Sequence, residues 1–239
     1  MFSFNLSSKV GNQAKNNVDE RKKAETPALC RVHNLIILDE SGSMQSIYRP
    51  ALSGVNETLQ TIRGAQTENP NQRHFVTLVT FDSRPGLRYN EIYHNIEAEK
   101  AADIAFEQYQ PYGATPLYDA MGRAINELRQ EIEDDDIVLV TIITDGYENS
   151  SQEYTGKAIK ALVKEMRAKD WVFTFIGANQ DVEKVANSMA INNHLEFKAD
   201  EEGAAEMFEK ELKSRKRFFA KLSVNFNKEA LQDDYFTDL

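Results

Sequence analysis

Short, apolar and largely β-branched runs alternate along this chain with longer stretches in which apolar residues recur at helical spacing. Runs of the first kind at residues 32–38, 74–81 and 137–144 are typical of strands buried on both faces, and the run at 137–144 is the most apolar. Residues 87–96 alternate as an edge strand or hairpin arm does, and short strands are predicted at 171–177 and 195–197.

The stretches of helical spacing fall between these strands. They predict helices at residues 47–62, 98–106, 117–133, 153–168, 181–189 and 202–219. Gly64 is expected to end the first of them. Because strands that alternate with helices form right-handed crossovers, the sequence predicts an α/β fold with a mostly parallel sheet and helices on both faces.

The two ends of the chain depart from this alternation. Residues 1–28 are rich in Ser, Asn, Gln and Lys without a sustained apolar period, so they are predicted to form a flexible arm. One domain is expected over residues 29–220, followed by an acidic tail at 221–239. The tail is predicted to be either an unstructured end or a ligand mimic that reaches a metal ion of the same or a neighbouring molecule. Its candidate ligands are Asp233, Asp234 and Asp238.

Charge limits the partners that this protein can have. Its 28 Lys and Arg residues against 38 Asp and Glu give a formal net charge of −10, which argues against general nucleic-acid binding. The basic cluster at residues 213–217 is predicted to be a solvated helix face with i,i+4 ion pairs, because Glu206, Glu209 and Glu211 lie close by.

Cysteine content and apolar run length indicate the compartment. Cys30 is the only cysteine, which excludes an internal disulfide and a Cys-rich zinc site and favours a reducing compartment. The start of the chain does not have the form of a secretory signal, and no apolar run approaches the ~18 residues of a membrane-spanning helix. A soluble, cytoplasmic protein without membrane contact is therefore expected.

Oxygen-bearing side chains gather in three loops. Asp39, Ser41 and Ser43 alternate after the first strand, Asp145 follows the most apolar strand, and Thr115 lies ahead of a helix. Ligands of open α/β sheets bind outside the carboxyl ends of the strands, so these residues are candidates for one site. Two carboxylates and three hydroxyls, without His or Cys, suit a hard cation, Mg²⁺ first and then Mn²⁺ or Ca²⁺. An incoming carboxylate could fill the coordination position that such a set leaves open.

This arrangement resembles the metal-ion-dependent adhesion site of von Willebrand factor A (VWA) domains. The motif of that site is D-x-S-x-S, then a loop threonine, then an aspartate after a core strand. The resemblance implies a doubly wound, Rossmann-like sheet with one antiparallel edge strand and a divalent ion at its top. It further implies that Ser41 and Ser43 bind the ion directly, and that Thr115 and Asp39 or Asp145 bind it directly or through water.

Members of this family typically bind an acidic side chain of a partner protein through the ion and are not enzymes. Residues 113–120 are especially similar to the intracellular bacterial branch. The resemblance therefore implies a metal-dependent interaction module of a bacterial cytoplasm whose protein partner supplies Asp or Glu. It leaves the identity of the partner and the oligomeric state open.

An enzyme is the alternative interpretation. A Mg²⁺-dependent phosphatase or phosphotransferase resembling the haloacid dehalogenase group would use Asp39 as its nucleophile. The acid that such an enzyme needs two residues later is Ser41 in this chain, and a hydroxyl of that kind is a poor general acid near neutral pH.

Residues beside the candidate ligands have two interpretations each. Glu40 and Glu148 are predicted either to add negative charge at the rim of the site or to be solvated charges. Asp119 is predicted either to support the site or to be an acid in the first turn of a helix, where it interacts favourably with the helix dipole; the second interpretation is favoured. Three tyrosines near the loops are predicted either to contact a partner or to pack beneath the loops, namely Tyr112, Tyr118 and Tyr147.

Overall fold

A single six-stranded sheet forms the centre of the molecule, in the strand order β3-β2-β1-β4-β5-β6. The computed structural model describes Met1 and residues 29–84, 86–224 and 232–237. All neighbouring strands are parallel except β3, which runs antiparallel to β2 at the edge. The strands are β1 (Cys30–Asp39), β2 (Gln72–Ser83), β3 (Leu87–Glu97), β4 (Ile137–Thr144), β5 (Val172–Gly177) and β6 (Asn193–Glu196).

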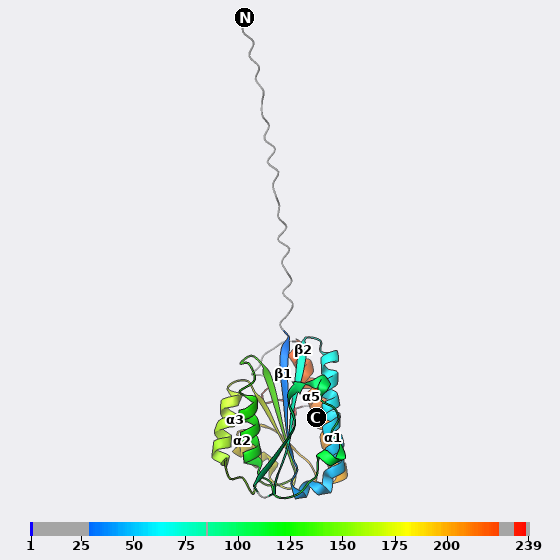
Figure 1. Cartoon of the computed structure of the whole chain (residues 1–239), viewed down its shortest axis with the longest axis vertical. Helices are drawn as coiled ribbons and strands as arrows, with labels where there is room; N and C mark the ends of the chain where they lie inside the picture. Colours follow the sequence, from blue (N-terminus) through cyan, green and yellow to red (C-terminus); the bar gives the residue numbers. More distant parts are fainter. Residues whose placement is uncertain (2–28, 85, 225–231, 238–239) are drawn as a thin grey trace.

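Helices cover both faces of this sheet, with α1 and α5 on one side and α2 and α3 on the other (Figure 1). The helices are α1 (Tyr48–Glu68), α2 (Leu117–Leu128), α3 (Gly156–Arg167), α4 (Val182–Ser188) and α5 (Glu201–Val224). Three short 3₁₀ helices lie in the connections from a strand to the next helix, η1 (Gly42–Ile47) between β1 and α1, and η2 (Ala98–Lys100) and η3 (Phe106–Gln108) between β3 and α2. The predicted fold class is thus confirmed. Within the described residues, no helix is long and apolar enough to cross a membrane.

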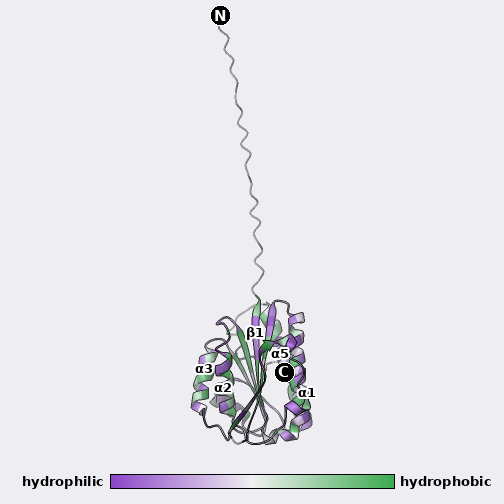
Figure 2. Cartoon of the chain, in the orientation of Figure 1, coloured by the Kyte–Doolittle hydropathy of each residue, from purple (hydrophilic) through white to green (hydrophobic). Residues whose placement is uncertain are grey.

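Alternation along the central strand divides the core into two layers. Val32 and Ile36 of β1 pack with α1 and α5, whereas Leu35 and Ile37 pack with α2, α3 and α4. Strand β4 is accordingly apolar along most of its length, whereas the edge strand β3 is largely polar and the helices mix hydrophilic and hydrophobic residues (Figure 2). Because β1 is hydrogen-bonded on both sides and buried on both faces, the loop that follows it is held on a rigid base.

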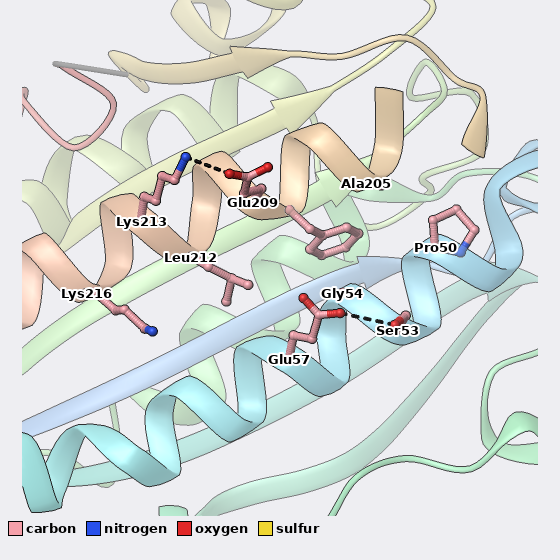
Figure 3. Close-up of a pocket in the computed structure, with 10 residues that line it drawn as sticks. Pro50, Ser53, Gly54, Glu57, Ala205, Glu209, Leu212, Lys213 and Lys216 are labelled. Atoms are coloured by element: carbon pink, nitrogen blue, oxygen red, sulfur yellow. Dashed lines mark hydrogen bonds and ion pairs between the residues drawn. The ribbon is translucent and has the colours of Figure 1, made fainter. Parts of the chain in front are cut away.

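Helices α1 and α5 lie side by side over one face of the sheet. A groove of about 420 Å³ remains between them. Figure 3 shows Pro50, Gly54 and Glu57 of α1 on one wall and Leu212 and Lys213 of α5 on the other. Beneath the groove the ring of Phe208 fills the space beside the Cα of Gly54.

The helix predicted at residues 98–106 is wrong, since only η2 and η3 form there. Side chains of α1 satisfy the backbone of this segment instead. Asn56 accepts a hydrogen bond from the Ile104 amide at 2.8 Å and donates one to the Ile104 carbonyl at 3.1 Å, and Arg63 donates to the Ala101 carbonyl. Helical hydrogen bonds are therefore not needed to pair these groups.

Three helix ends also differ from their predictions. Helix α1 continues through Gly64 to Glu68, because Ala65 is a buried core residue and the Asn69 amide and side chain complete the last turn. Helix α2 stops at Leu128, five residues before the predicted end, where a turn leads into the acidic residues ahead of β4. Helix α5 runs to Val224 and so passes residue 220, where the domain was expected to end.

Candidate metal centre

Asp39 lies at the carboxyl end of β1, in the middle of the sheet. Its Oδ2 accepts a hydrogen bond from the Thr144 hydroxyl at 2.6 Å, and its Oδ1 accepts one from the Ser41 amide at 2.7 Å. The side chain has no exposed surface. The pairing of β1 with β4 brings the two strand ends together, since Leu38 faces Ile143 in the register.

The hydroxyls of Ser41 and Ser43 join this end of β1 to Asp145 after β4. Their oxygens lie 3.2 Å apart, and Ser43 Oγ donates a hydrogen bond of 2.5 Å to Asp145 Oδ1. The other carboxylate oxygen of Asp145, Oδ2, is buried and has no hydrogen-bond partner among the described residues. Ser43 is exposed, so the cluster opens to solvent on its side.

Thr115 reaches the same place from the loop ahead of α2. A Cβ added to Gly146 would lie 3.3 Å from Ser43 Oγ and 3.5 Å from Thr115 Oγ1, so both hydroxyls border the space that this glycine leaves free. The Thr115 amide donates to Asn149 Oδ1 at 2.8 Å, and its carbonyl accepts from the Asn149 amide at 3.1 Å. All five predicted ligand residues therefore lie in one cluster at the carboxyl end of the sheet.

Electrostatics at this cluster favour a bound cation. Burial and, to a smaller extent, the nearby charge of Asp145 raise the pKa of Asp39 to about 7, although the hydrogen bonds from Thr144 and Ser41 lower it. Burial also raises the pKa of Asp145, while the hydrogen bond from Ser43 lowers it. Two buried carboxyl groups side by side are costly to ionise unless positive charge compensates them.

The donors present fit a hard divalent ion. They are all oxygens, and the unpartnered Oδ2 of Asp145 is the kind of buried acceptor that a cation satisfies. The residues that would hold the ion are Asp39, Ser41, Ser43, Thr115 and Asp145. The geometry gives no support to Asp39 as a nucleophile, because the position that such an enzyme needs for its general acid holds Ser41, whose hydroxyl lies 3.2 Å from the Ser43 hydroxyl.

Glu40 is a structural residue of the site. The prediction of a charge at the rim is wrong for it, because its side chain is buried. Its carboxylate accepts hydrogen bonds from the Thr80 hydroxyl at 2.5 Å, the Gln110 amide at 2.6 Å and the Arg88 guanidinium at 3.3 Å. Glu40 thereby fixes the end of β1 to β2 and to the loop that carries Thr115.

Asp119 and Glu148 hold the loop that follows Asp145. Asp119 is buried and accepts hydrogen bonds from three backbone amides of that loop at 2.7 to 2.9 Å. Asp119 does lie in the first turn of α2, where the helix dipole favours an acid, and these contacts show that it also supports the loop beside the site. Glu148 accepts hydrogen bonds from the Ser150, Ser151 and Tyr118 amides. The acidic side chains are in the sequence, but nothing in it shows that they are buried against amide groups.

Two of the three nearby tyrosines are exposed at this end of the domain. Tyr112 is 64% exposed and Tyr147 is 56% exposed, whereas Tyr118 is partly buried against Gly156. The guanidinium of Arg84 lies 5.0 Å from the centre of the Tyr112 ring. Exposed tyrosines offer contact area at low entropic cost, so Tyr112 and Tyr147 are available to a partner.

Fold and site together define an α/β domain with a cluster of oxygen-bearing side chains at the carboxyl ends of its central strands. A sequence model of the von Willebrand factor type A domain matches residues 35–213, and the chain belongs to this family. Domains of this family are generally non-enzymatic modules for protein–protein interaction, and they often bind a divalent metal. The match gives no support to the phosphatase alternative. No curated protein matches the chain.

Solved structures show the same fold at low sequence identity. A von Willebrand factor type A protein from Catenulispora acidiphila is 18% identical with a TM-score of 0.51, and the match covers 80% of this chain and 42% of that one. The PilB minor pilin from Streptococcus sanguinis is 11% identical with a TM-score of 0.60, over 84% and 64%. The SpaC pilus adhesin from Lactobacillus rhamnosus GG is 15% identical with a TM-score of 0.58, over 80% and 31%. The chain thus spans less than two thirds of each of these proteins.

Proposed function

We propose that this protein is a metal-dependent interaction module that takes up an Asp or Glu side chain of a partner protein through a divalent cation, Mg²⁺ first and Mn²⁺ or Ca²⁺ as alternatives. The observation that carries the proposal is the unpartnered, buried Oδ2 of Asp145 beside the equally buried carboxyl group of Asp39. The bound ion would supply Lewis acidity and an open coordination position for the partner's carboxylate.

The chain's own residues orient the site. Thr144 and the Ser41 amide hold Asp39, and Ser43 presents its hydroxyl at the exposed side. Tyr112 and Tyr147 offer apolar contact around the entrance. We place the partner in the cytoplasm as part of the same proposal, because a single cysteine fits a reducing compartment.

Calorimetric titration of chelator-stripped full chain with Mg²⁺, Mn²⁺ and Ca²⁺ tests the metal. Saturable binding is expected for the wild type and should be lost in Ser41→Ala and in Asp145→Ala. Ser53→Ala is the matched control, since Ser53 is exposed at the groove between α1 and α5, and its side chain hydrogen-bonds to Glu57 of the same helix. Unchanged binding in folded Ser41→Ala and Asp145→Ala would overturn the metal site.

Capture of partner proteins from a bacterial extract tests the interaction. Capture that needs the ion, and that fails in chelator and in Asp145→Ala, is expected. Capture of the same proteins in chelator would contradict a partner carboxylate bound through the ion. The two experiments separate a wrong metal site from a wrong partner chemistry.

A further inference from the structure

A second ligand-like arrangement lies at the other end of the domain, where residues 232–237 pack against α3, β6 and α5. Asp233 and Asp234 point to basic side chains there and not to the metal centre, so the mimic predicted for the same molecule is not formed by them; Asp238 lies outside the described residues. Seven residues, 225–231, separate this segment from the end of α5 in the sequence.

Side chains of the domain hold the backbone of this segment. The nearly buried Asn193 donates from Nδ2 to the Gln232 carbonyl at 2.6 Å and accepts at Oδ1 from the Tyr235 amide at 3.1 Å. Arg217 donates to the Tyr235 carbonyl at 2.7 Å and to the Asp234 carbonyl at 3.4 Å. The side-chain amide of Asn193 thus pairs with both a carbonyl and an amide group of this segment, whose residues 234–237 form a turn with a hydrogen bond of 3.3 Å from the Thr237 amide to the Asp234 carbonyl.

Basic side chains form ion pairs with the two aspartates of this segment. Arg167 Nη2 lies 2.6 Å from Asp233 Oδ1, which also accepts a hydrogen bond of 2.8 Å from Asn192. Lys221 pairs with Asp234. Two successive acidic positions thus meet two cations from different helices, although the chain as a whole is strongly acidic.

The tyrosine is the anchor. Tyr235 is 2% exposed and packs against the ring of Phe218 with 5.8 Å between the ring centres. Its hydroxyl donates a hydrogen bond of 2.9 Å to Glu211 Oε1, the same oxygen that pairs with the fully buried Arg215 at 2.7 Å. A phenylalanine would fill the pocket but leave this buried carboxylate with one donor fewer, so the pocket selects tyrosine.

From these contacts we infer that the surface formed by Arg167, Asn193 and Arg217 is a peptide-binding site for an acidic segment of the form Asp-Asp-Tyr, and that the chain's own residues 232–237 are its resident ligand. The inference does not rest on the metal centre. A partner protein with a segment of the same chemistry would compete with the resident tail for this surface.

The test uses the full chain carrying Tyr235→Ala, whose own tail lacks the anchor, and a labelled synthetic peptide of residues 232–239. Saturable binding is expected. The wild-type chain should bind the peptide roughly 100-fold more weakly, because a tail tethered by a short linker competes at an effective concentration of the order of millimolar. Arg217→Ala added to Tyr235→Ala should abolish binding.

Peptide variants test the recognition chemistry. A peptide with Tyr235→Phe should bind at least about 10-fold more weakly, because it loses a hydrogen bond to a charged acceptor. A peptide with both Asp233→Asn and Asp234→Asn should also bind more weakly. Absence of binding to folded Tyr235→Ala, or equal binding of all three peptides, would overturn the inference.

A second measurement tests the same inference without Tyr235→Ala, and it serves if that variant does not fold. A specific protease site placed within residues 225–231 is cut after the full chain has folded, and the release of the terminal peptide on dilution is followed. Release and rebinding with the domain still folded support a peptide-binding site. Unfolding of the domain on cutting, or a peptide that never dissociates, would show that the tail is an integral part of the core.

Discussion

The two buried carboxyl groups of the candidate metal centre, Asp39 and Asp145, lie in an environment that disfavours their charge. Burial raises the pKa of both, and for Asp39 the value reaches about 7. In the ion-free protein Asp39 is therefore partly protonated near neutral pH. A divalent ion bound as proposed would compete with this proton for the carboxylate.

This competition predicts a pH-dependent affinity for Mg²⁺. Relative to a carboxyl group that titrates near 3.8 when unfolded, a group raised to about 7 stabilises the ion-free fold at low pH, and this contribution is lost as the pH rises through about 7. Since Mg²⁺ needs the ionised form, its dissociation constant should be about 10- to 30-fold higher near pH 5.5 than near pH 8. Titration calorimetry at the two pH values measures the ratio. Equal affinities would contradict a protonated Asp39 in the ion-free state.

Asp39→Asn is the companion variant. It should abolish Mg²⁺ binding but make the ion-free protein less sensitive to pH between about 4 and 7, because the group that takes up the proton on folding is gone. Chemical denaturation in chelator across this range gives the free energy of unfolding. If the free energy of unfolding of the variant changed with pH as it does in the wild type, the proton taken up on folding would belong to another group.

Asp119 supports the centre without being a candidate ligand. Asp119→Asn replaces an acceptor of the Gln152 amide by a donor and removes the charge that three backbone amides share. A loss of about 1–3 kcal/mol in the free energy of unfolding is expected, together with weaker Mg²⁺ binding, since the loop after Asp145 loosens. Urea denaturation and calorimetry measure the two effects.

Asp103→Asn is the matched control for this change, because Asp103 is exposed and its bonds to Arg63 and Gln60 lie on the surface. It should shift the free energy of unfolding by less than about 1 kcal/mol and leave the ion affinity unchanged. Should Asp119→Asn behave like this control, the loop would be held by other contacts.

At the scale of the elements, two glycines of α1 provide a matched pair. A Cβ on Gly54 would lie 2.1 Å from the Phe208 ring of α5, whereas a Cβ on Gly64 would meet no atom within 4 Å. Gly54→Ala should therefore lower the free energy of unfolding by about 1–3 kcal/mol through overpacking. Gly64→Ala should raise it by roughly 0.5–1 kcal/mol, because alanine favours the helix.

Thermal and urea denaturation of the two variants check this pair. Equal effects of the two substitutions would mean that α5 does not press on α1 at Gly54. The groove beside this contact is visible in Figure 3, and the penalty for Gly54→Ala also reports how firmly α5 is held against α1.

The elements that the sequence predicted best are those that burial determines most strictly. The strand at residues 137–144 has its predicted bounds because every residue of β4 is buried. The segment at 98–106 misled the prediction, because its backbone is paired by Asn56 and Arg63 from a distant helix. Such tertiary hydrogen bonds leave no periodic trace in the local sequence.

The same limit applies to the candidate site. The spacing of Asp39, Ser41 and Ser43 singled out one loop of the cluster, since alternate polar positions after a buried strand are a local pattern. Glu40 and Asp119 support the site by accepting hydrogen bonds from backbone amides that are distant in the sequence. Which amides they contact is determined only by the assembled fold of strands and loops.

At the scale of the whole molecule, a buried polar network ties α5 to the central strands. Arg215 has no exposed surface, so the predicted solvated face is wrong at this position, although Lys213 does pair with Glu209 on the outside. The guanidinium of Arg215 donates hydrogen bonds to Asn34 of β1 at 2.9 Å and to Thr141 of β4 at 2.8 Å. Burying an arginine is tolerable only because each of these groups and the carboxylate of Glu211 pairs with it.

His74 lies beside this network and makes the fold sensitive to acid. It is fully buried, 3.0 Å from Gln72 Oε1 and edge-on to Phe219, and burial together with the charge of Arg215 lowers its pKa to about 4. The unfolded chain takes up a proton below about 6.5 while the folded protein does not, so stability is lost as the pH falls from about 6.5 to about 4. The loss due to this residue is at most about 3 kcal/mol.

Comparison with His74→Gln isolates this contribution, because the opposite slope from Asp39 is common to both proteins and cancels in the difference. The variant should be somewhat less stable than the wild type near pH 8, where it lacks the contact with Phe219, and this difference in the free energy of unfolding should narrow or reverse toward pH 4.

For His94→Gln the difference from the wild type should change with pH in the opposite direction. The carboxylates of Glu131 and Glu91 raise the pKa of His94, so its contribution is present in acid and is lost as the pH rises through that raised value. Urea denaturation of the three proteins from about pH 4 to pH 8 measures the differences, and a gap that stays constant for His74→Gln would show that the buried imidazole does not govern the acid response.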